Sequence, residues 1–154
     1  MENYLYFRNQ ATLSSDDDVA QSGLFPVSSF LGMHPTSDTA LTLFFKPRQL
    51  VDSTSSVALN QDSTHDVAAS TLQTIASKTE ADNVILTITA NKHKEVMQAL
   101  ANTMTQSQAG FINVADDLTG STSYLHANIT ACGAITIQTA GTVGAPTLVA
   151  VSTG

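Results

Sequence analysis

The residues of this chain that could bind a metal are few and widely separated. The histidines and the cysteine are His34, His65, His93, His126 and Cys132. No two of them have the short spacing at which zinc ligands usually occur in pairs. Three consecutive aspartates at 16–18 also lack the alternating spacing of a calcium-binding loop. The sequence therefore predicts no metal site, and we expect the acidic run to be a solvated turn.

Motifs that would organise a catalytic set are also missing from the sequence. Serines and aspartates are plentiful, but there is no G-x-S-x-G elbow, no glycine-rich phosphate loop and no dinucleotide fingerprint. Cys132 lies between Ala131 and Gly133 in an expected strand, where a small buried thiol is the usual role. We therefore expect no catalytic residue, no cofactor and a protein that is not an enzyme.

One basic cluster breaks a local rule. Lys92, His93 and Lys94 fall in the first turn of an expected helix, where the macrodipole disfavours each cation by ~0.3–1 kcal/mol. They could form a small anion-binding or partner-binding spot that meets an acidic patch such as Asp116–Asp117. The alternative is that they are solvated while Asn91 caps the helix. We favour this alternative because exposed ion pairs contribute little.

Composition excludes several classes of partner. The formal net charge is −7 with only 6 Lys and Arg, which argues against binding nucleic acid or docking on an anionic membrane. No apolar run reaches the roughly 20 residues of a membrane span. The N-terminal residues MENYLYFRNQ do not resemble a signal peptide, so we expect synthesis in the cytoplasm of the host. Abundant Ser and Thr favour a β-rich fold with a neutral polar surface.

The centre of the chain predicts a strand, a helix and a second strand in succession. Apolar residues alternate over 84–88, which is typical of a strand with one buried face. From about 91 to 106 the apolar residues instead recur on one helical face, with Val96, Leu100 and Met104 among them. A second extended run begins at Phe111 after Gly110. This unit shows that the chain folds but carries no catalytic signature.

Other segments predict further strands. We expect strands at Tyr4–Phe7, Thr39–Lys46, Ile129–Gln138 and Leu148–Val151, and an apolar stretch broken at Pro26. Residues 14–23 should form a loop, and residues 52–66 a loop or a weak edge hairpin. Residues 67–78 fit either a helix capped by Asp66 or a strand, and we interpret them as extended. The predicted fold is α+β: a β-rich, mostly antiparallel sheet or small sandwich of six to eight strands with one main helix. It forms one domain over 1–154, whose tail 139–154 is free to extend onto a neighbouring subunit.

Four runs of the sequence carry a family resemblance: YLYFR from Tyr4, PVSSFLGMHPTSDTALTLFFK from Pro26, LTITANKHKEVMQAL from Leu86 and FINVADD from Phe111. In these runs the chain resembles a group of small proteins encoded by tailed phages of marine cyanobacteria. The resemblance implies a virion protein present in many copies on the capsid. It carries no catalytic or ligand motif, so no functional residue is transferred.

These observations lead to one expected function and two alternatives. We expect a capsid decoration or cement protein on the capsid surface, bound to the major capsid protein and to copies of itself as a dimer or trimer. Attachment would use sheet edges or an extended terminus. The expected partner-binding residues are Tyr4, Tyr6, Phe7, Lys92, Lys94, Leu148, Val149 and Val151. The alternatives are a tail, neck or fibre component of the virion, and a small anion-binding module that uses Lys92–Lys94.

Overall fold

The computed structural model describes residues 2–48 and 81–137. These residues belong to one compact unit, Met1–Arg48 with Glu80–Gln138. The predictions for 52–66, 67–78 and the tail 139–154, including Leu148, Val149 and Val151, lie outside the described residues. A single domain over 1–154 therefore stays a prediction.

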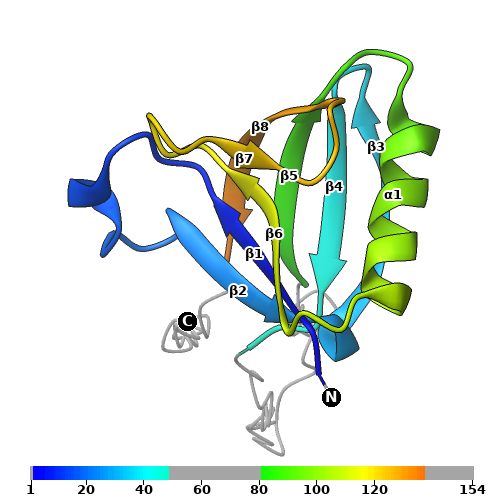
Figure 1. Ribbon diagram of the computed structural model, residues 1–154, viewed down its shortest axis with the longest axis horizontal. Coiled ribbons are helices and arrows are strands. Elements are labelled where there is room, and N and C mark those ends of the chain that lie inside the picture. Colours follow the sequence, from blue (N-terminus) through cyan, green and yellow to red (C-terminus); the bar gives the residue numbers. More distant parts are fainter. Residues whose placement is uncertain (1, 49–80, 138–154) are drawn as a thin grey trace, which may run out of the picture. The chain divides into compact units, whose positions relative to one another are not determined.

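The described residues form eight strands and one α-helix in two four-stranded sheets (Figure 1). The first sheet has the order β2-β1-β6-β7 and the second the order β3-β4-β5-β8. The strands are β1 (Tyr4–Arg8), β2 (Ser22–Pro26), β3 (Phe30–Ser37), β4 (Ala40–Phe45), β5 (Asp82–Ile88), β6 (Phe111–Asp116), β7 (Ser123–Tyr124) and β8 (Ile129–Thr136). The helix is α1 (His93–Gln106), and short 3-10 turns occur at Leu13–Ser15 and Val27–Ser29. The predicted α+β small sandwich is confirmed.

Strand pairing is antiparallel except at one place. In the first sheet β1 pairs antiparallel with β2 and parallel with β6, and all pairs in the second sheet are antiparallel. The predicted strand–helix–strand unit is present as β5, α1 and β6, but its two strands lie in different sheets. The chain thus passes from the second sheet to the first through α1.

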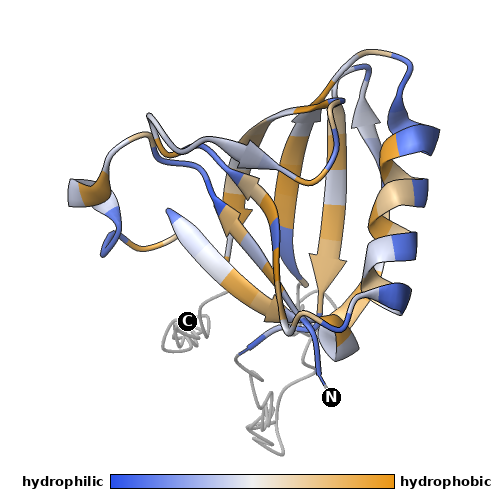
Figure 2. Ribbon diagram, viewed as in Figure 1, coloured by the Kyte–Doolittle hydropathy of each residue, from blue (hydrophilic) through white to orange (hydrophobic). Residues whose placement is uncertain are grey.

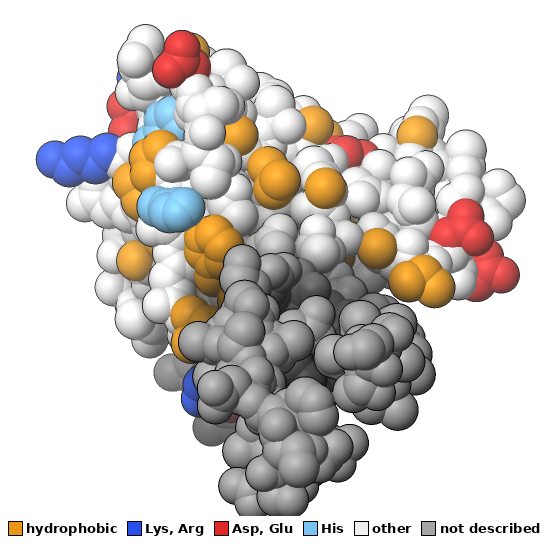
Figure 3. All heavy atoms as spheres, turned by 180° about the vertical axis from the view of Figure 1, so that it is seen from behind, with side chains coloured by type: hydrophobic (Ala, Val, Ile, Leu, Met, Phe, Trp, Pro, Cys, Tyr) orange, Lys and Arg blue, Asp and Glu red, His pale blue; other side chains and the backbone are white. Residues whose placement is uncertain are grey.

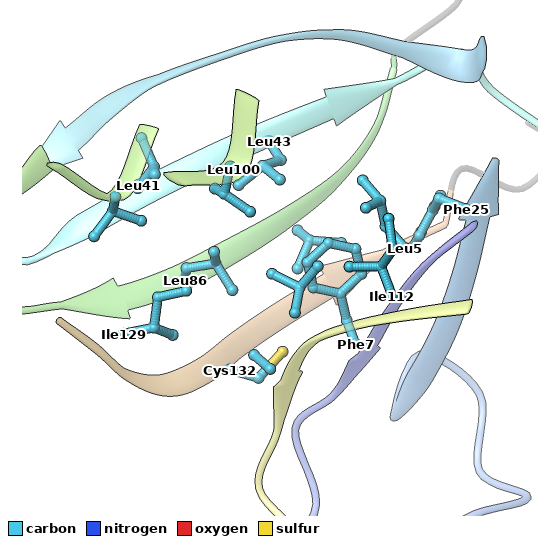
Figure 4. Packing of buried hydrophobic residues seen from close by; sticks show 14 of the residues in the cluster. Leu5, Phe7, Phe25, Leu41, Leu43, Leu86, Leu100, Ile112, Ile129 and Cys132 are labelled. Carbon is cyan, nitrogen blue, oxygen red and sulfur yellow. The ribbon is translucent and has the colours of Figure 1, made fainter. Parts of the chain in front are cut away.

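One hydrophobic cluster joins the inner faces of both sheets and the helix (Figure 4). Alternation buries Leu41, Leu43 and Phe45 of β4, and the buried side of α1 includes Leu100, which lies beside β4. Phe7 supplies a ring from the first sheet. Apolar side chains of both sheets and of α1 are therefore buried against one another, and the removal of this surface from water is the main contribution to the free energy of folding.

Three phenylalanine rings connect the two sheets directly. Phe25 of β2 stacks on Phe45 of β4 with ring centroids 4.3 Å apart. Phe7 of β1 meets the two rings edge-on at 5.9 and 6.1 Å. Offset and edge-to-face contacts of this kind are favoured by the ring quadrupoles. The rings therefore fix how the first sheet packs on the second.

The helix begins slightly later than its predicted start near Asn91. Lys92 is the N-cap residue and makes no side-chain capping hydrogen bond. Asn91 has φ +63°, in the left-handed region that asparagine tolerates better than most residues. The predicted capping role of Asn91 is wrong, because its backbone is used to turn the chain into α1.

Within the described ranges no helix is long and apolar enough to cross a membrane.

Two phenylalanines test the core assignment. Phe7→Ala should lower the free energy of unfolding by about 3–5 kcal/mol, because it removes a fully buried ring between the sheets. Phe111→Ala, at a side chain that is 54% exposed, should lower it by less than about 1 kcal/mol. Urea denaturation of both variants measures the difference. Equal losses would contradict the orientation of β1 and β6.

Candidate functional site

The first strand separates its side chains strictly between two faces. Leu5 and Phe7 point into the core and are fully buried, while Tyr4 and Tyr6 lie on the outer face of the first sheet. Tyr4 is 40% exposed. The expectation that Phe7 binds a partner is therefore corrected: its ring has no access to the surface, because it packs against Phe25 and Phe45.

Neighbouring strands extend the two tyrosines into an apolar patch. The register places Tyr4 between Pro26 of β2 and Phe111 of β6, and places Tyr6 beside Leu24 of β2. The rings of Tyr6 and Phe111 are 5.2 Å apart. Leu24 is 41% exposed and Phe111 54%. These five residues are called the aromatic face below.

Exposure, rather than hydropathy alone, shows where this face lies. The apolar segments of β1, β2 and β6 in Figure 2 include the buried residues of the inner side of the first sheet. On the outer side, Tyr4, Leu24 and Phe111 are among the large hydrophobic residues left exposed in the described ranges. Contiguous exposed apolar side chains of this kind usually mark an interaction site, whereas single ones do not.

The opposite end of the same face is polar and is covered by the chain itself. Arg8 lies between Ser22 of β2 and Asp116 of β6, and is only 4% exposed. Its guanidinium forms an ion pair with Asp16 at 3.1 Å and donates to the carbonyl oxygen of Thr12 at 3.3 Å. The loop predicted at 14–23 ends earlier, because β2 starts at Ser22. The acidic run is thus not only a solvated turn, since Asp16 neutralises a buried cation.

Tyr6 lies on β1 between the apolar end of the face at Tyr4 and the polar end at Arg8. Burial raises the pKa of its phenol, and Asp116 and Asp16 act in the same direction while Arg8 opposes them. Its hydroxyl therefore remains a neutral hydrogen-bonding group at ordinary pH. The first sheet accordingly grades from apolar at Tyr4 to charged at Arg8.

The outer face of the second sheet has a different character. The imidazole of His34 meets the ring of Phe44 edge-on at 5.0 Å, and the hydroxyl oxygens of Thr36 and Thr42 are 2.9 Å apart. The view from behind shows apolar side chains and histidines mixed with uncharged polar atoms (Figure 3). Leu31 of β3 is 56% exposed, as much as Phe111 of β6.

The basic cluster at the start of α1 does not converge on one point. The ammonium of Lys92 lies 2.8 Å from Glu95, and this hydrogen bond is the main reason that the pKa of Glu95 is lowered. The Nε2 atom of His93 lies 3.0 Å from the carbonyl oxygen of Ser37 and so faces the turn between β3 and β4. Lys94 is exposed and forms no ion pair within the described part of the chain. The three groups therefore give little support to a shared anion site.

The acidic patch proposed to meet this cluster is engaged elsewhere. The carboxylate of Asp117 accepts the hydroxyl of Tyr124 at 2.7 Å and the backbone N–H of Cys132 at 3.0 Å. Asp116 accepts the backbone N–H of Leu118. Cys132 is buried, as its sequence context predicted. The structure thus assigns Asp117 to holding β8 rather than to contact with Lys92–Lys94.

Side chains also close parts of two sheet edges. On β8, the carboxylate of Asp117 accepts a hydrogen bond from the backbone N–H of Cys132. The side-chain amide of Asn9 donates one to the carbonyl oxygen of Gly133 at 3.2 Å. On β2, the guanidinium of Arg48 donates to the carbonyl oxygen of Leu24 at 2.5 Å. Pro26 has no N–H to offer. Strand addition, the expected mode of attachment at sheet edges, is therefore blocked at these positions of β8 and β2.

The residues expected from the sequence to bind a partner include Tyr4 and Tyr6 of this outer face, but not Phe111 or Leu24. The signal was present in β6, where Phe111 has the opposite phase to the buried Ile112 and Val114.

Among the residues of the two described ranges, no three His, Cys, Asp or Glu side chains gather at a possible metal site. No family model, no curated protein and no solved structure matches this chain.

The cluster around Asp117 predicts a dependence of stability on alkaline pH. Burial, with the nearby charge of Asp117, raises the pKa of Cys132 to about 12 and of Tyr124 to about 12, from ordinary values of 9.0 and 10.0. Folding therefore favours the protonated forms. The resulting stability is complete below pH 9 and is lost as the pH rises from about 9 toward 12.

Comparison with a variant isolates the thiol. In Cys132→Ala the thiol no longer contributes, so this loss should begin nearer pH 10, where the phenol of an unfolded chain ionises. Free energies of unfolding of both proteins, measured by denaturant from pH 7 to 11, give the two slopes. Identical slopes between pH 9 and 10 would show that the thiol titrates normally in the folded protein.

Proposed function

We propose that this chain is a structural protein of a tailed-phage virion, bound to the major capsid protein as a decoration or cement subunit. The observation that carries the proposal is the aromatic face, an exposed apolar patch across three strands that the described chain leaves uncovered. The four runs that resemble small proteins of cyanobacterial phages add independent support. The proposed role is not catalytic.

A surface of this type is suited to permanent protein contact. Aromatic side chains are enriched at protein interfaces, where they bury a large area with few rotatable bonds. Removing apolar surface from water contributes roughly 25 cal/mol per Å². A subunit that binds only the assembled shell stabilises that state by mass action, without a cofactor. The proposed mechanism is therefore geometric: the subunit adds contact area between neighbouring capsomers and opposes their separation.

Stoichiometry in purified virus particles tests the role. A decoration protein should be present at about one copy per major capsid subunit, or at a simple fraction such as about one third, because it follows the symmetry of the capsomers. Quantitative mass spectrometry with isotope-labelled peptides of both proteins measures this ratio. A handful of copies per particle would instead indicate a tail, neck or fibre component. Complete absence from particles would contradict a structural role.

Charge reversal separates the structural role from the anion-binding alternative. The double variant Lys92→Glu and Lys94→Glu should leave incorporation into particles unchanged, because Lys92 is the N-cap residue of α1 and Lys94 lies in its first turn, both outside the aromatic face. Phe111→Ser should reduce incorporation, because it removes the most exposed ring of that face. Particle-bound and free protein can be compared after complementation of a phage that lacks the gene. The opposite pattern would favour recognition of an anionic ligand by Lys92–Lys94.

A further inference from the structure

We propose that Arg8 binds a carboxylate of a partner protein, and that Asp16 occupies this site in the free chain. Asp16 belongs to the segment 9–21, which connects β1 to β2 and is called the strap below. The strap has to lift from the sheet before an outside carboxylate can replace that of Asp16. The identity of the partner rests on the proposed function, whereas the exchange of carboxylates at Arg8 is a property of the free chain.

The guanidinium of Arg8 is buried, but its donors are only partly used. Its Nη2 atom lies 3.1 Å from a carboxylate oxygen of Asp16 and 3.3 Å from the carbonyl oxygen of Thr12. The adjacent Nε atom is also buried and has no hydrogen-bond partner within the described residues. Carboxylates often bind arginine through two parallel hydrogen bonds, and Nε with Nη2 forms an edge that allows this. The ion pair with Asp16 thus uses one of the two adjacent donors and leaves the other to a better-placed carboxylate.

The strap is held without a hydrophobic core of its own. Figure 1 shows it looping out beyond the end of β1. None of its side chains from 11 to 20 is buried, and Leu13 and Val19 are 67% and 86% exposed. Ala20 has φ +65°, in the left-handed region that is unfavourable for a residue with a Cβ atom. Segments with so few buried apolar contacts open locally at a small fraction of the free energy of global unfolding.

The ends of the strap allow it to lift while the sheet stays intact. The backbone N–H of Asn9 donates to the carbonyl oxygen of Gln21 at 3.0 Å, which joins the two ends next to the paired strands β1 and β2. Opening of the middle of the strap therefore requires no change in strand register. It removes Thr12 and Asp16 from Arg8 and uncovers the guanidinium.

Arg8 is continuous with the aromatic face. It lies on the same side of β1 as Tyr4 and Tyr6, because these residues alternate with the buried Leu5 and Phe7. Burial raises the pKa of Tyr6, and the nearby guanidinium of Arg8 acts against this effect. A partner whose apolar side chains cover the aromatic face therefore reaches Arg8 with an acidic side chain once the strap has lifted.

Replacement of one carboxylate by another keeps the charge at Arg8 unchanged. The formal net charge of −7 opposes the binding of a further acidic group beside Asp16, but it does not oppose an exchange. The lifted strap also carries Asp17 and Asp18 with it. The side chain of Asp16 is 53% exposed, so water weakens its attraction to Arg8. A carboxylate covered by a partner is screened less.

Nuclear magnetic resonance of the Nε–H group of Arg8 tests the exchange, with sodium acetate as the probe at constant ionic strength. In Asp16→Ser this signal should shift and saturate as acetate is added. The wild-type protein should need at least about tenfold more acetate, because the tethered carboxylate of Asp16 competes at a high effective concentration. Asp18→Ser is the matched control, since it removes a neighbouring exposed carboxylate of the strap and should behave as wild type. Arg8→Lys assigns the signal, because Arg48 is the only other arginine in the sequence.

Amide hydrogen exchange tests the lifting of the strap. Exchange at residues 11–20 should be faster in Asp16→Ser than in Asp18→Ser, because only the first variant loses the ion pair with Arg8. Circular dichroism and thermal unfolding confirm that each variant is folded. Equal exchange in the two variants would show that Asp16 does not hold the strap and would overturn the inference.

Two results of the acetate titration would also overturn it. One is the absence of a saturable shift in Asp16→Ser up to about 100 mM acetate, a concentration at which even millimolar binding is complete. The other is equal affinity of wild type and Asp16→Ser for acetate. Incorporation of folded Arg8→Lys into particles at the wild-type level would overturn the use of Arg8 by the partner, because lysine lacks the planar pair of donors. Exchange at Arg8 in a protein absent from particles would leave the site standing and contradict the proposed function.

Discussion

The contact of Phe7, Phe25 and Phe45 is the interaction on which the rest of the structure depends. The three rings come from β1, β2 and β4, so they hold the first sheet against the second. Sheets of four short strands bury little area on their own. Once the rings are packed, every strand of the first sheet has a fixed inner face, and the outer face follows from the two-residue period.

That period produces the aromatic face as a direct consequence of the core. In β1, burial of Leu5 and Phe7 forces Tyr4 and Tyr6 outward. The parallel neighbour β6 buries Ile112 and Val114 and thereby presents Phe111 beside Tyr4. The face is thus not the result of a loop or a loosely held side chain. Its rings stand on strands whose other sides are fully buried, which gives them the fixed positions that a contact surface requires.

The sequence allowed the elements to be predicted more readily than their arrangement. Alternation over 84–88 and the helical period of Val96, Leu100 and Met104 were sufficient to predict β5 and α1. The same local signals could not show that β5 and β6 belong to different sheets, because pairing depends on residues far apart in the chain. They also led to the expectation that Phe7 contacts a partner together with Tyr4 and Tyr6. The two-residue period already places Phe7 on the opposite face from Tyr4 and Tyr6, but only the packing of β1 on the second sheet shows which of the two faces is buried.

Polar side chains account for the difference between the closed edges and the open face. Asp117 and Asn9 occupy backbone groups of β8, and Arg48 occupies one of β2. Natural sheets protect their edges in this way, because unpaired backbone groups invite pairing with other chains. The guanidinium of Arg8 is also paired, because it forms an ion pair with Asp16 and donates a hydrogen bond to the carbonyl oxygen of Thr12. Tyr4, Leu24 and Phe111 have received no such cover within the described residues. These polar groups are paired, whereas three large apolar side chains of one sheet face are left exposed to water. Exposed apolar side chains that lie together in this way usually mark a surface that contacts another molecule.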